Sequence, residues 1–377
     1  MLNSLVTMMF GSMVTILVWS LPISSGKFSL VVIAFLVALI AAILLTPAAM
    51  RLARAAGVMD QPHARRVHTR PTPRWGGLAM YVSFALAVLL VMLFRLLKYN
   101  EPAINPRIAG ILVCGGLITA LGALDDKYSL PAKLKLLGQI AIAILLTLPF
   151  FGVRILVAFD IPFISGQVYH IPLWREALSY LFTVVWVVAI TNTINLIDGL
   201  DGLAAGVSGL AALTFVVIGV AMKGAFGEAI LAAAVVGACV GFLRYNFHPA
   251  KVFMGDAGSH FLGFTIAALS ILQNWKVAAG ITLAIPVFIL AVPIFDTAFA
   301  IVRRLRRGQP IFSPDKGHLH HRLLNLGLNQ RQVVLCIYLL TVVGCLLALF
   351  LSHTRLKPYR QNQPAPKPAV QQQHMDR

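Results

Sequence analysis

Charged residues are scarce in this chain. Asp, Glu, Lys and Arg together make up 12% of its 377 residues, while hydrophobic residues make up 59%. Soluble globular domains carry about 25% charged residues, so this composition excludes an ordinary soluble domain. It predicts an all-α integral membrane protein in which repeated apolar segments form one multi-span helical bundle.

Cysteine is also rare, and its placement excludes two kinds of site. The four cysteines form no CxxC pair and no spacing typical of metal ligands. All of them lie inside apolar segments, where they serve as small packing residues. They are Cys114, Cys239, Cys336 and Cys345.

Acidic residues are few as well. The chain has 13 Asp and Glu and 31 Lys and Arg, which gives a formal net charge of +18. Such an excess can indicate a nucleic-acid partner. In a membrane protein, however, Lys and Arg concentrate in the cytoplasmic loops and suit anionic headgroups and phosphates. We therefore expect membrane lipid, and not nucleic acid, as the partner of the basic residues.

Long hydrophobic runs are the dominant feature. A helix needs about 20 apolar residues to cross the hydrocarbon core, and this criterion predicts ten to eleven transmembrane helices in one domain over residues 1–352. The first run resembles a signal peptide, but no Lys or Arg precedes it, which favours a helix. Two prolines, Pro286 and Pro293, predict a kink in the tenth run. The Pro- and Gln-rich residues 353–377 are expected to form a disordered tail. The predicted spans are 3–22, 28–50, 77–96, 107–124, 133–151, 178–195, 203–222, 227–246, 259–273, 277–302 and 331–352.

The polar residues predict an orientation. With the amino terminus inside, 18 of the 31 Lys and Arg fall on the inner side, and five of the other 13 belong to the tail. The acids gather on the same side, where a positive-inside bias does not require them. Asp296 lies about two helical turns before Arg303, near the same face. This clustering predicts a polar site at the cytoplasmic face. The acids of the inner segments are Asp60, Asp125, Asp126, Asp198, Asp201, Asp256 and Asp315.

The segment LGALDDKYSL ends one predicted span. Adjacent Asp125 and Asp126 at a membrane edge are costly unless a cation or water compensates them. A DDxxD metal motif would need a third Asp where Ser129 stands, so that motif is excluded. A solvated turn with Lys127 as counter-charge is the alternative to a functional pair.

The segment NTINLIDGLDGL carries a regular polar pattern. Asn192, Asn195 and Asp198 are spaced three apart, so they share one face if the helix continues. This oxygen-rich face, followed by Asp201, suits Mg²⁺ and hydroxyl recognition. A polar cap between two membrane helices is the alternative.

The segment KVFMGDAGSHF places Asp256 among glycines before a helix. We expect Ser259 to cap that helix. A helix amino terminus with small residues favours phosphate, and Asp256 is a natural Mg²⁺ ligand beside it. An ordinary capped turn is the alternative.

Histidines and a basic loop complete the polar motifs. His318, His320 and His321 follow a basic run, but no cysteine accompanies them and the last two point to different helix faces, which disfavours zinc. Donors to a phosphate or sugar are favoured over contact with lipid headgroups. The basic loop 60–77, which contains Arg70, suits phosphates or anionic lipid.

Five segments in this order resemble the polyprenyl-phosphate N-acetylhexosamine-1-phosphate transferase family. They are DQPH…GG at 60–77, LDD at 124–126, NTINLIDGLDGL at 192–203, VFMGDAGS at 252–259 and HLHH at 318–321. The resemblance spans residues 28–350. It implies two substrates, undecaprenyl phosphate in the membrane and UDP-GlcNAc in the cytoplasm, with Mg²⁺ as cofactor and Mn²⁺ as its substitute. The implied location is the bacterial cytoplasmic membrane.

The resemblance also implies roles for individual residues. Asp256 is implied as the principal Mg²⁺ ligand, with Asn195 as a second. Asp125 is implied to face the lipid phosphate, with Asp126 beside it. The remaining implied roles are uracil stacking by Phe253, nucleotide contact by Asp198 and Asp201, phosphate contact by Lys135, and contact with the sugar-phosphate end by His320 and His321.

Three alternatives stay open. Leu319 interrupts the histidines, which favours the GlcNAc branch over the phospho-MurNAc-pentapeptide translocase that makes lipid I. A transporter would place its polar residues near the midplane, and here only Asp296 lies well inside a predicted span. A non-catalytic scaffold would not explain five polar motifs on one side. The oligomeric state stays open, with a homodimer among the options.

Overall fold

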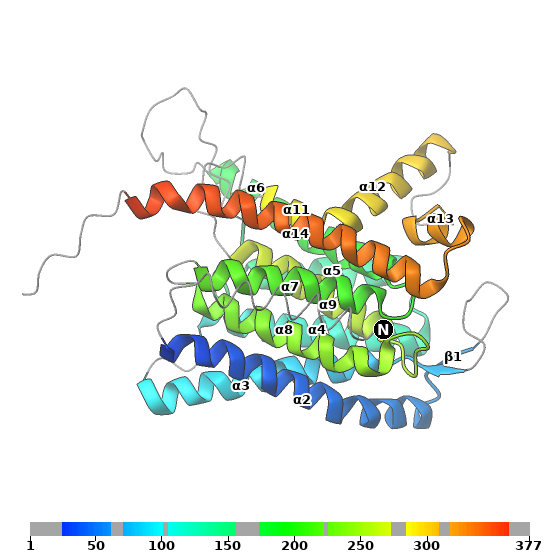
Figure 1. The fold of residues 1–377 in the computed structure, drawn as a ribbon, viewed down its shortest axis with the longest axis horizontal. Coiled ribbons are helices and arrows are strands. Elements are labelled where there is room, and N and C mark those ends of the chain that lie inside the picture. Colours follow the sequence, from blue (N-terminus) through cyan, green and yellow to red (C-terminus); the bar gives the residue numbers. More distant parts are fainter. Residues whose placement is uncertain are drawn as a thin grey trace, which may run out of the picture.

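The computed structural model describes residues 25–61, 71–100, 105–155, 173–221, 225–272, 284–308 and 317–361. These residues are almost entirely helical, and the helices lie roughly along one direction (Figure 1). The predicted all-α membrane fold is confirmed. The predicted first span, 3–22, lies outside the described residues.

Twelve helices and one small hairpin make up the described part of the chain. The hairpin pairs β1 (Met59–Asp60) with β2 (Thr72–Pro73) in antiparallel register. The helices are α2 (Ser25–Ala55), α3 (Gly76–Tyr99), α4 (Pro106–Tyr128), α5 (Ala132–Thr147), α6 (Leu173–Ile197), α7 (Leu203–Ala221), α8 (Phe226–Asn246), α9 (Gly255–Leu272), α11 (Ala284–Ile289), α12 (Ala291–Arg306), α13 (Leu319–Asn325) and α14 (Gln330–Gln361).

Seven of the described helices are long and apolar enough to cross a membrane: α2, α3, α4, α6, α7, α8 and α14. Each corresponds to a predicted span. Three other predicted spans form shorter or interrupted helices. The 133–151 span is the 16-residue α5, the 259–273 span is the buried α9, and the 277–302 span contains α11 and α12. The predicted kink is a break at Leu290, between the two prolines.

The carboxyl-terminal helix differs from the predicted boundary. α14 continues to Gln361, whereas the disordered tail was expected to begin at residue 353. The difference has a simple cause. An apolar criterion ends where polar side chains begin, but a helix needs no apolar face once it has left the hydrocarbon core. Residues 362–377 lie outside the described part of the chain.

The helices pack through small residues. On α8, Gly237 and Gly241 lie against the α2 backbone, and a Cβ at either glycine would overlap the carbonyl oxygens of Phe35 and Leu39. Lipid tails are as apolar as the side chains they would replace, so close backbone approach, and not apolar burial, drives such contacts. The pair thus allows α2 and α8 to meet over much of their length.

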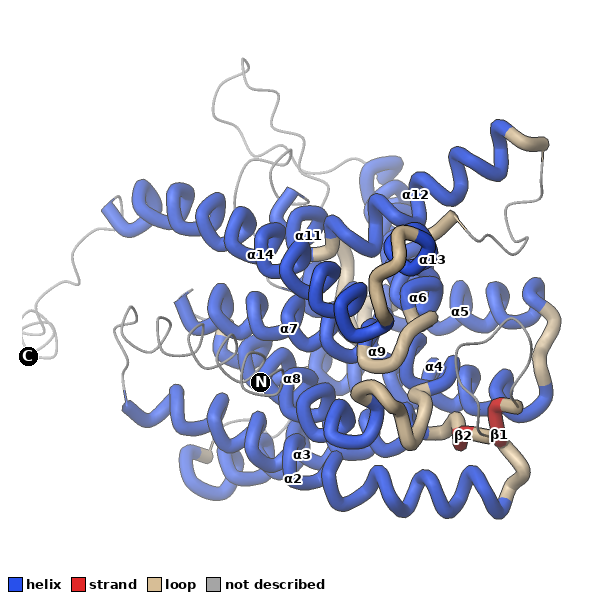
Figure 2. The backbone as a smooth tube through the Cα atoms, turned by 45° about the vertical axis from the view of Figure 1, so that its right-hand side comes forward, coloured by secondary structure: helices blue, strands red, loops and turns tan. Residues whose placement is uncertain are grey.

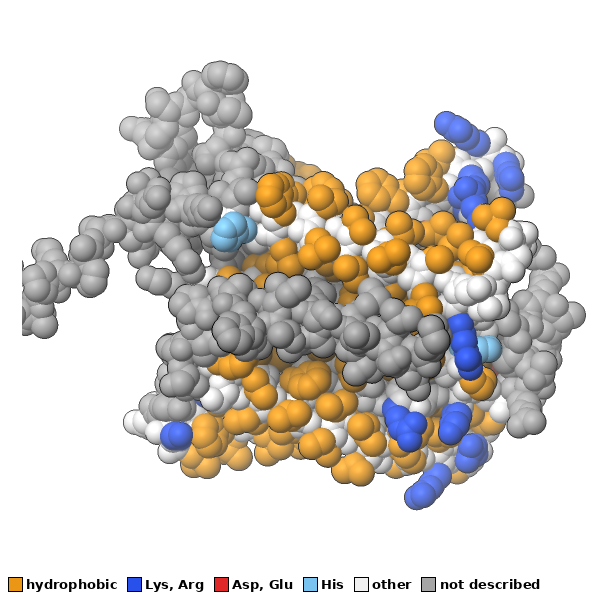
Figure 3. Space-filling model, viewed as in Figure 1, with side chains coloured by type: hydrophobic (Ala, Val, Ile, Leu, Met, Phe, Trp, Pro, Cys, Tyr) orange, Lys and Arg blue, Asp and Glu red, His pale blue; other side chains and the backbone are white. Residues whose placement is uncertain are grey.

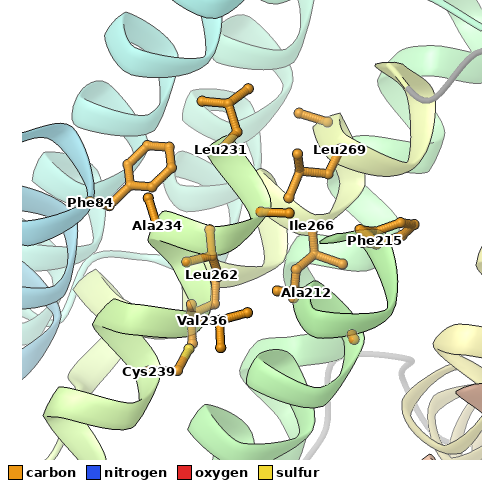
Figure 4. Close-up of a cluster of buried hydrophobic side chains, with 14 of the residues drawn as sticks. Phe84, Ala212, Phe215, Leu231, Ala234, Val236, Cys239, Leu262, Ile266 and Leu269 are labelled. Atoms are coloured by element: carbon orange, nitrogen blue, oxygen red, sulfur yellow. The ribbon is translucent and has the colours of Figure 1, made fainter. Parts of the chain in front are cut away.

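Helix α9 occupies the centre of the bundle. It packs against α3, α4, α6, α7 and α8, and all of its residues except Asp256 are buried. Figure 4 shows three of its side chains, Leu262, Ile266 and Leu269, among residues of α3, α7 and α8. Because α9 is enclosed on all sides, its amino terminus has a well-defined position.

Apolar and basic side chains occupy different parts of the surface. Apolar side chains such as Leu44, Leu97 and Phe350 are exposed along the lengths of the helices, and they cover the body of the molecule in Figure 3. Lys and Arg side chains gather mainly at the right-hand end in that view, where Figure 1 places β1, α12 and α13. The apolar body is suited to contact lipid, and the basic end to lie outside it.

Candidate functional site

Several helix termini converge at the basic end of the bundle. The carboxyl ends of α4, α6 and α8 meet the amino ends of α3, α5, α7 and α9 there, and the connecting loops and the β1–β2 hairpin lie beside them (Figure 2). This up-and-down arrangement places Asp125, Asp198 and Asp256 at the same end of the molecule. The predicted convergence of these distant aspartates is therefore confirmed in the structure.

A lysine joins two of these carboxylates. Lys135, on the first turn of α5, donates to Asp125 Oδ2 and, at 2.7 Å, to Asp256 Oδ2. Asp125 Oδ1 accepts the backbone N–H of Leu130 at 2.8 Å. Both oxygens of Asp125 are thus engaged. We call Asp125, Lys135, Asp256 and Asn195 the ionic centre.

Asp126 has a different set of partners from its neighbour. Its two oxygens accept the backbone N–H groups of Asp256 (3.0 Å) and Ala257 (3.2 Å) at the start of α9. Free N–H groups at a helix amino terminus attract an anion. We expected a phosphate at this position, but the anion that the structure places there is the Asp126 carboxylate.

The prediction that Ser259 caps α9 is wrong. The helix begins at Gly255, so Ser259 lies inside it, and its hydroxyl bonds back to the Gly255 carbonyl at 3.2 Å. The capping carboxylate comes from a segment 130 residues earlier in the chain. Local sequence could not reveal it, because capping patterns assume a nearby side chain.

Close packing around the start of α9 brings these groups together. A Cβ at Gly77 would overlap Gly258, and a Cβ at Gly122 would overlap the backbone of Asp256. Both glycines therefore permit α3 and α4 to approach the first turn of α9. Arg74 is shared between Asp60 and Asp126, with Nε 3.6 Å and 3.9 Å from one oxygen of each.

Asn195 lies on the other side of Asp256. Its Nδ2 donates to Asp256 Oδ1 at 3.0 Å and to Ser259 Oγ at 2.9 Å. The predicted pair is thus in direct contact, but the amide nitrogen faces the carboxylate. In this arrangement Asn195 orients Asp256.

The loop between α6 and α7 is fixed by groups that the motif did not include. Asp201 Oδ2 accepts from His248 Nδ1 at 2.8 Å and from the Ala250 N–H at 3.1 Å. The Gly202 N–H donates to Asn246, and the Gly202 carbonyl accepts from Tyr338 at 2.6 Å. Asp201 therefore ties its loop to the segment that precedes α9.

Asp198 is crowded by like charge. The pKa of Asp198 is raised to about 8, chiefly by burial and then by the nearby carboxylates of Asp256 and Asp126, while Arg74 opposes them. Four carboxylates (Asp125, Asp126, Asp198 and Asp256) thus lie near two cations, Lys135 and Arg74. Ionising all four would leave the cluster with an excess of negative charge; the raised pKa of Asp198 reflects this crowding, and a further cation would relieve it.

The histidine segment has an anchor of its own. Asp296 Oδ2 lies 2.9 Å from His318 Nδ1, and Asp296 Oδ1 accepts the Leu319 N–H at 2.8 Å. On the same helix, Arg303 lies against Gly317, where a Cβ would be 2.5 Å from Nε. Helix α12 thus positions the start of α13.

The two predicted histidines lie together. The rings of His320 and His321 are 4.3 Å apart, and a Cβ on Gly199 would come within 2.8 Å of His320 Nε2. His320 therefore lies against the α6–α7 loop, next to Asp198. Burial lowers the pKa of His320 to about 4, with His321 and His318 contributing. His320 is consequently neutral at neutral pH and able both to donate and to accept.

Phe253 and Arg70 are the remaining predicted residues. The backbone of Phe253 is held in place, since its N–H donates to the Pro73 carbonyl at 2.8 Å and its carbonyl accepts from Gly76 at 3.0 Å. Its ring is partly exposed, as a stacking surface must be. Arg70 lies outside the described residues.

Sequence reasoning missed several polar residues around the site. A signal was available for two of them, since Gln139 follows Lys135 by four residues and His260 follows Asp256 by four, which places each pair on one helix face. No local pattern pointed to the others. These residues are Gln139, His260, Asn246, His248 and Tyr338.

The donors present suit a hard cation. Among the described residues, no three His, Cys, Asp or Glu side chains are grouped to hold a metal ion by themselves. Mg²⁺ ordinarily binds through one or two carboxylates together with substrate phosphates. Asp256 supplies such a carboxylate, and three further carboxyl groups lie near it, so the residues fit Mg²⁺ bound jointly with a phosphorylated substrate.

Comparison with known proteins agrees with the motifs. The family model described as glycosyl transferase family 4 matches residues 108–274. The chain is 42% identical over 324 residues to the "Probable undecaprenyl-phosphate N-acetylglucosaminyl 1-phosphate transferase" of Bacillus subtilis (strain 168), covering 85% of both chains. It is 40% identical to the "Decaprenyl-phosphate N-acetylglucosaminephosphotransferase" of Mycolicibacterium smegmatis, covering 75% of this chain and 72% of that protein.

A more distant relative extends the similarity. The "Undecaprenyl-phosphate alpha-N-acetylglucosaminyl 1-phosphate transferase" of Escherichia coli (strain K12) is 29% identical over 309 residues, covering 80% of this chain and 77% of that protein. These alignments cover 75% to 85% of this chain, and the family model's range contains Asp125, Asn195 and Asp256. The chain belongs to glycosyl transferase family 4, the polyprenyl-phosphate N-acetylhexosamine-1-phosphate transferases that its five motifs resemble.

Proposed function

We propose that this protein transfers GlcNAc-1-phosphate from UDP-GlcNAc to undecaprenyl phosphate. The products are undecaprenyl-pyrophosphoryl-GlcNAc and UMP, and the step initiates a cell-envelope polysaccharide. The observation that carries the proposal is the ionic centre, in which Lys135 and Asn195 hold Asp256 at the buried start of α9. The names of the relatives support the choice of lipid and sugar.

The reaction is a phosphoryl transfer. An oxygen of the lipid phosphate attacks the sugar-bearing phosphorus of UDP-GlcNAc, and the bond from that phosphorus to the bridging oxygen breaks. UMP leaves with the bridging oxygen. Catalysis of this kind consists mainly of positioning and charge stabilisation, which is what a preorganised cluster of charged side chains provides.

Lys135 and Asp125 of the ionic centre have different proposed roles. Lys135 supplies a cationic donor for the phosphates. Asp125 accepts from Lys135 and from the Leu130 N–H, and its proposed role is to hold Lys135 and orient the acceptor. The lipid phosphate needs no base, because the second pKa of a phosphate monoester is about 6.

Mg²⁺ is part of the proposal. Asp256 would hold it, and Asn195 would hold Asp256 in position. When bound, the ion would neutralise charge on the pyrophosphate and the departing UMP. His320, beside Gly199, and the adjoining His321 would donate to the sugar-phosphate end, and Phe253 would stack on uracil.

The architecture suits two substrates that cannot share a solvent. A polyprenyl chain stays in the bilayer, whereas a UDP-sugar stays in water, so they meet only at the interface. The ionic centre lies at the basic end of an apolar body (Figure 3). Since Lys and Arg concentrate on the cytoplasmic side, we place this end in the cytoplasm.

The test is a transfer assay in detergent with radiolabelled UDP-GlcNAc and undecaprenyl phosphate. We expect tunicamycin-sensitive label in the lipid phase, loss of activity with EDTA and recovery with Mg²⁺ or Mn²⁺. Transfer only from UDP-MurNAc-pentapeptide would contradict the sugar assignment. Gradient-driven uptake of UDP-GlcNAc into proteoliposomes, without product, would indicate a transporter.

A further inference from the structure

A second layer of polar side chains lies one helical turn away from the ionic centre, towards the middle of the bundle. Each member shares a helix face with one residue of the ionic centre, because positions three or four apart lie one above the other. The members are Gln139, four residues after Lys135 on α5; His260, four residues after Asp256 on α9; and Asn192, three residues before Asn195 on α6.

Two of the three members are buried in an apolar bundle, and Asn192 is partly buried. Gln139 is 1% exposed and His260 is 0% exposed. Burying an amide or an imidazole is costly unless hydrogen bonds compensate it. The next inward-facing residues on α5, Ala143 and Leu146, are apolar and fully buried, so on this face of α5 Gln139 follows Lys135 and apolar residues come next.

The hydrogen bonds of the layer have a defined direction. Asn192 Nδ2 lies 2.8 Å from the Val188 carbonyl, which can only accept, so this atom must be the amide nitrogen. The same Nδ2 lies 2.6 Å from Gln139 Oε1, which must therefore accept. Gln139 then presents Nε2 to His260 Nε2, 3.3 Å away. Since Gln139 donates, His260 Nε2 accepts, and His260 is neutral with its proton on Nδ1, a buried atom for which the described residues provide no acceptor.

The layer also joins helices that carry the ionic centre. α5 packs on α4 and α6, and its outer face is exposed at Leu134 and Leu137. Two long side chains reach from α5 to α9: Lys135 to Asp256, and Gln139 to His260. Asn192 completes the link to α6. The hydrogen bond between Gln139 and His260 thus limits how far α5 can shift relative to α9. It thereby also limits the movement of the Lys135 ammonium group.

We propose that Asn192, Gln139 and His260 are positioning residues for the transfer reaction, a role that rests on the function proposed above. They hold α5, α6 and α9 in the spacing at which Lys135 bridges Asp125 and Asp256. They touch neither substrate nor metal, and they act through Lys135 and Asp256.

Gln139→Leu and His260→Leu test the proposal by kinetics. Each is expected to lower kcat about tenfold with KM for UDP-GlcNAc within about twofold, because positioning affects the transition state more than binding. The double variant is expected to match the worse single variant, since each substitution removes the same hydrogen bond between Gln139 and His260. His260→Gln, which can accept near the position of Nε2, restores most of kcat, whereas the shorter His260→Asn does not. Thr265→Val, a buried polar change farther along α9, serves as the control and keeps full activity.

A second measurement does not need activity. Competitive acylation of the purified protein with acetic anhydride, read by mass spectrometry, reports the reactivity of Lys135 relative to the exposed Lys133. In Gln139→Leu we expect Lys135 to react several times faster, with Lys133 unchanged. Unchanged Lys135 reactivity overturns the proposal, whatever happens to kcat, and so does faster labelling with unchanged kcat. An inactive wild-type protein whose Lys135 is nevertheless released by Gln139→Leu contradicts the proposed function and leaves the positioning of Lys135 supported.

Discussion

The ionic centre and the histidine segment, two polar regions at the same end of the bundle, are held in different ways. At the ionic centre, the Asp256 carboxylate accepts hydrogen bonds from side chains of α5 and α6. The backbone N–H of Asp256 donates to Asp126 of α4. In the histidine segment, His318 and the Leu319 N–H both bond to a single carboxylate, Asp296. One region is bonded by side chains from several helices, whereas in the other Asp296 bonds two groups and the apolar residues of α13 pack on the core.

The difference follows from where each region lies. α9 is enclosed by five helices, whereas α12 lies towards the outside, with Phe295 and Phe299 exposed. Reacting phosphates need groups that do not reorganise, which suits the enclosed site. A segment with one anchor can adjust when a substrate arrives. The comparison leads us to expect different responses to mutation in the two regions.

The largest effect is expected from Asp256→Asn. The change removes the carboxylate that Lys135 and Asn195 hold, and we expect transfer activity to fall about 10³-fold or more, as for loss of a principal electrostatic group. Initial rates with radiolabelled UDP-GlcNAc measure it. Glu228→Gln, in the first turn of α8 and about 27 Å along that helix from the site end, is the matched control and should stay active. Activity within tenfold of wild type would remove Asp256 from the centre of the mechanism.

A smaller but still large effect is expected from Asp296→Ala. Without this carboxylate, His318 and the start of α13 lose their shared anchor, and His320 shifts from its place beside Gly199. We expect a loss of about 10²-fold, the usual cost of a misplacement of roughly 1 Å. Thr297→Ala, the adjacent residue, is the control. If Asp296→Ala proved harmless, the histidine segment would not depend on a single anchor.

A milder effect is expected from Asp126→Asn, because Asp256 is also held by the side chains of Lys135 and Asn195. An amide still offers one acceptor oxygen to the start of α9, so one of the two capping bonds survives. Loss of a cap costs about 1 kcal/mol, which corresponds to a Tm lower by about 2 °C, and kcat should fall only a few-fold. A kcat as low as that of Asp256→Asn would show that Asp126 acts in the chemistry and not only as a cap.

The smallest effect concerns pH. The pKa of Asp198 is raised to about 8, so between pH 4 and pH 8 the folded protein keeps a proton that the unfolded chain releases. Stability therefore decreases as pH rises through this window. We expect Tm to fall between pH 5.5 and pH 8.5 in wild type, and to fall less in Asp198→Asn. Identical slopes in the two proteins would show that Asp198 does not titrate there.

The fold was largely readable from the sequence because lipid imposes one simple condition. Runs such as 28–50 and 331–352 have few alternatives to a membrane helix, and α2 and α14 are found there. Boundaries were less certain where the apolar criterion ends before the helix does, as at Gln361. The helix break at Leu290 followed from its flanking prolines.

The site was readable in part. Asp125, Asp256, Asn195 and Lys135 were expected in one place, and the structure joins them directly. The expected Ser259 cap failed, because the cap comes from Asp126 on another helix. Asp296 was expected only to lie near the site, and its bond to His318 joins residues 22 apart in the chain.

The sequence by itself determined that the chain spans a membrane and which polar segments gather at one end, because hydrophobic length and charge act locally and can be counted. Tertiary structure alone decided which oxygen meets which donor. Asp125 and Asp126 are neighbours with the same side chain, yet one bonds Lys135 and the other caps α9. That division arises because adjacent helical residues point about 100° apart, so each meets a different neighbour in the packed bundle.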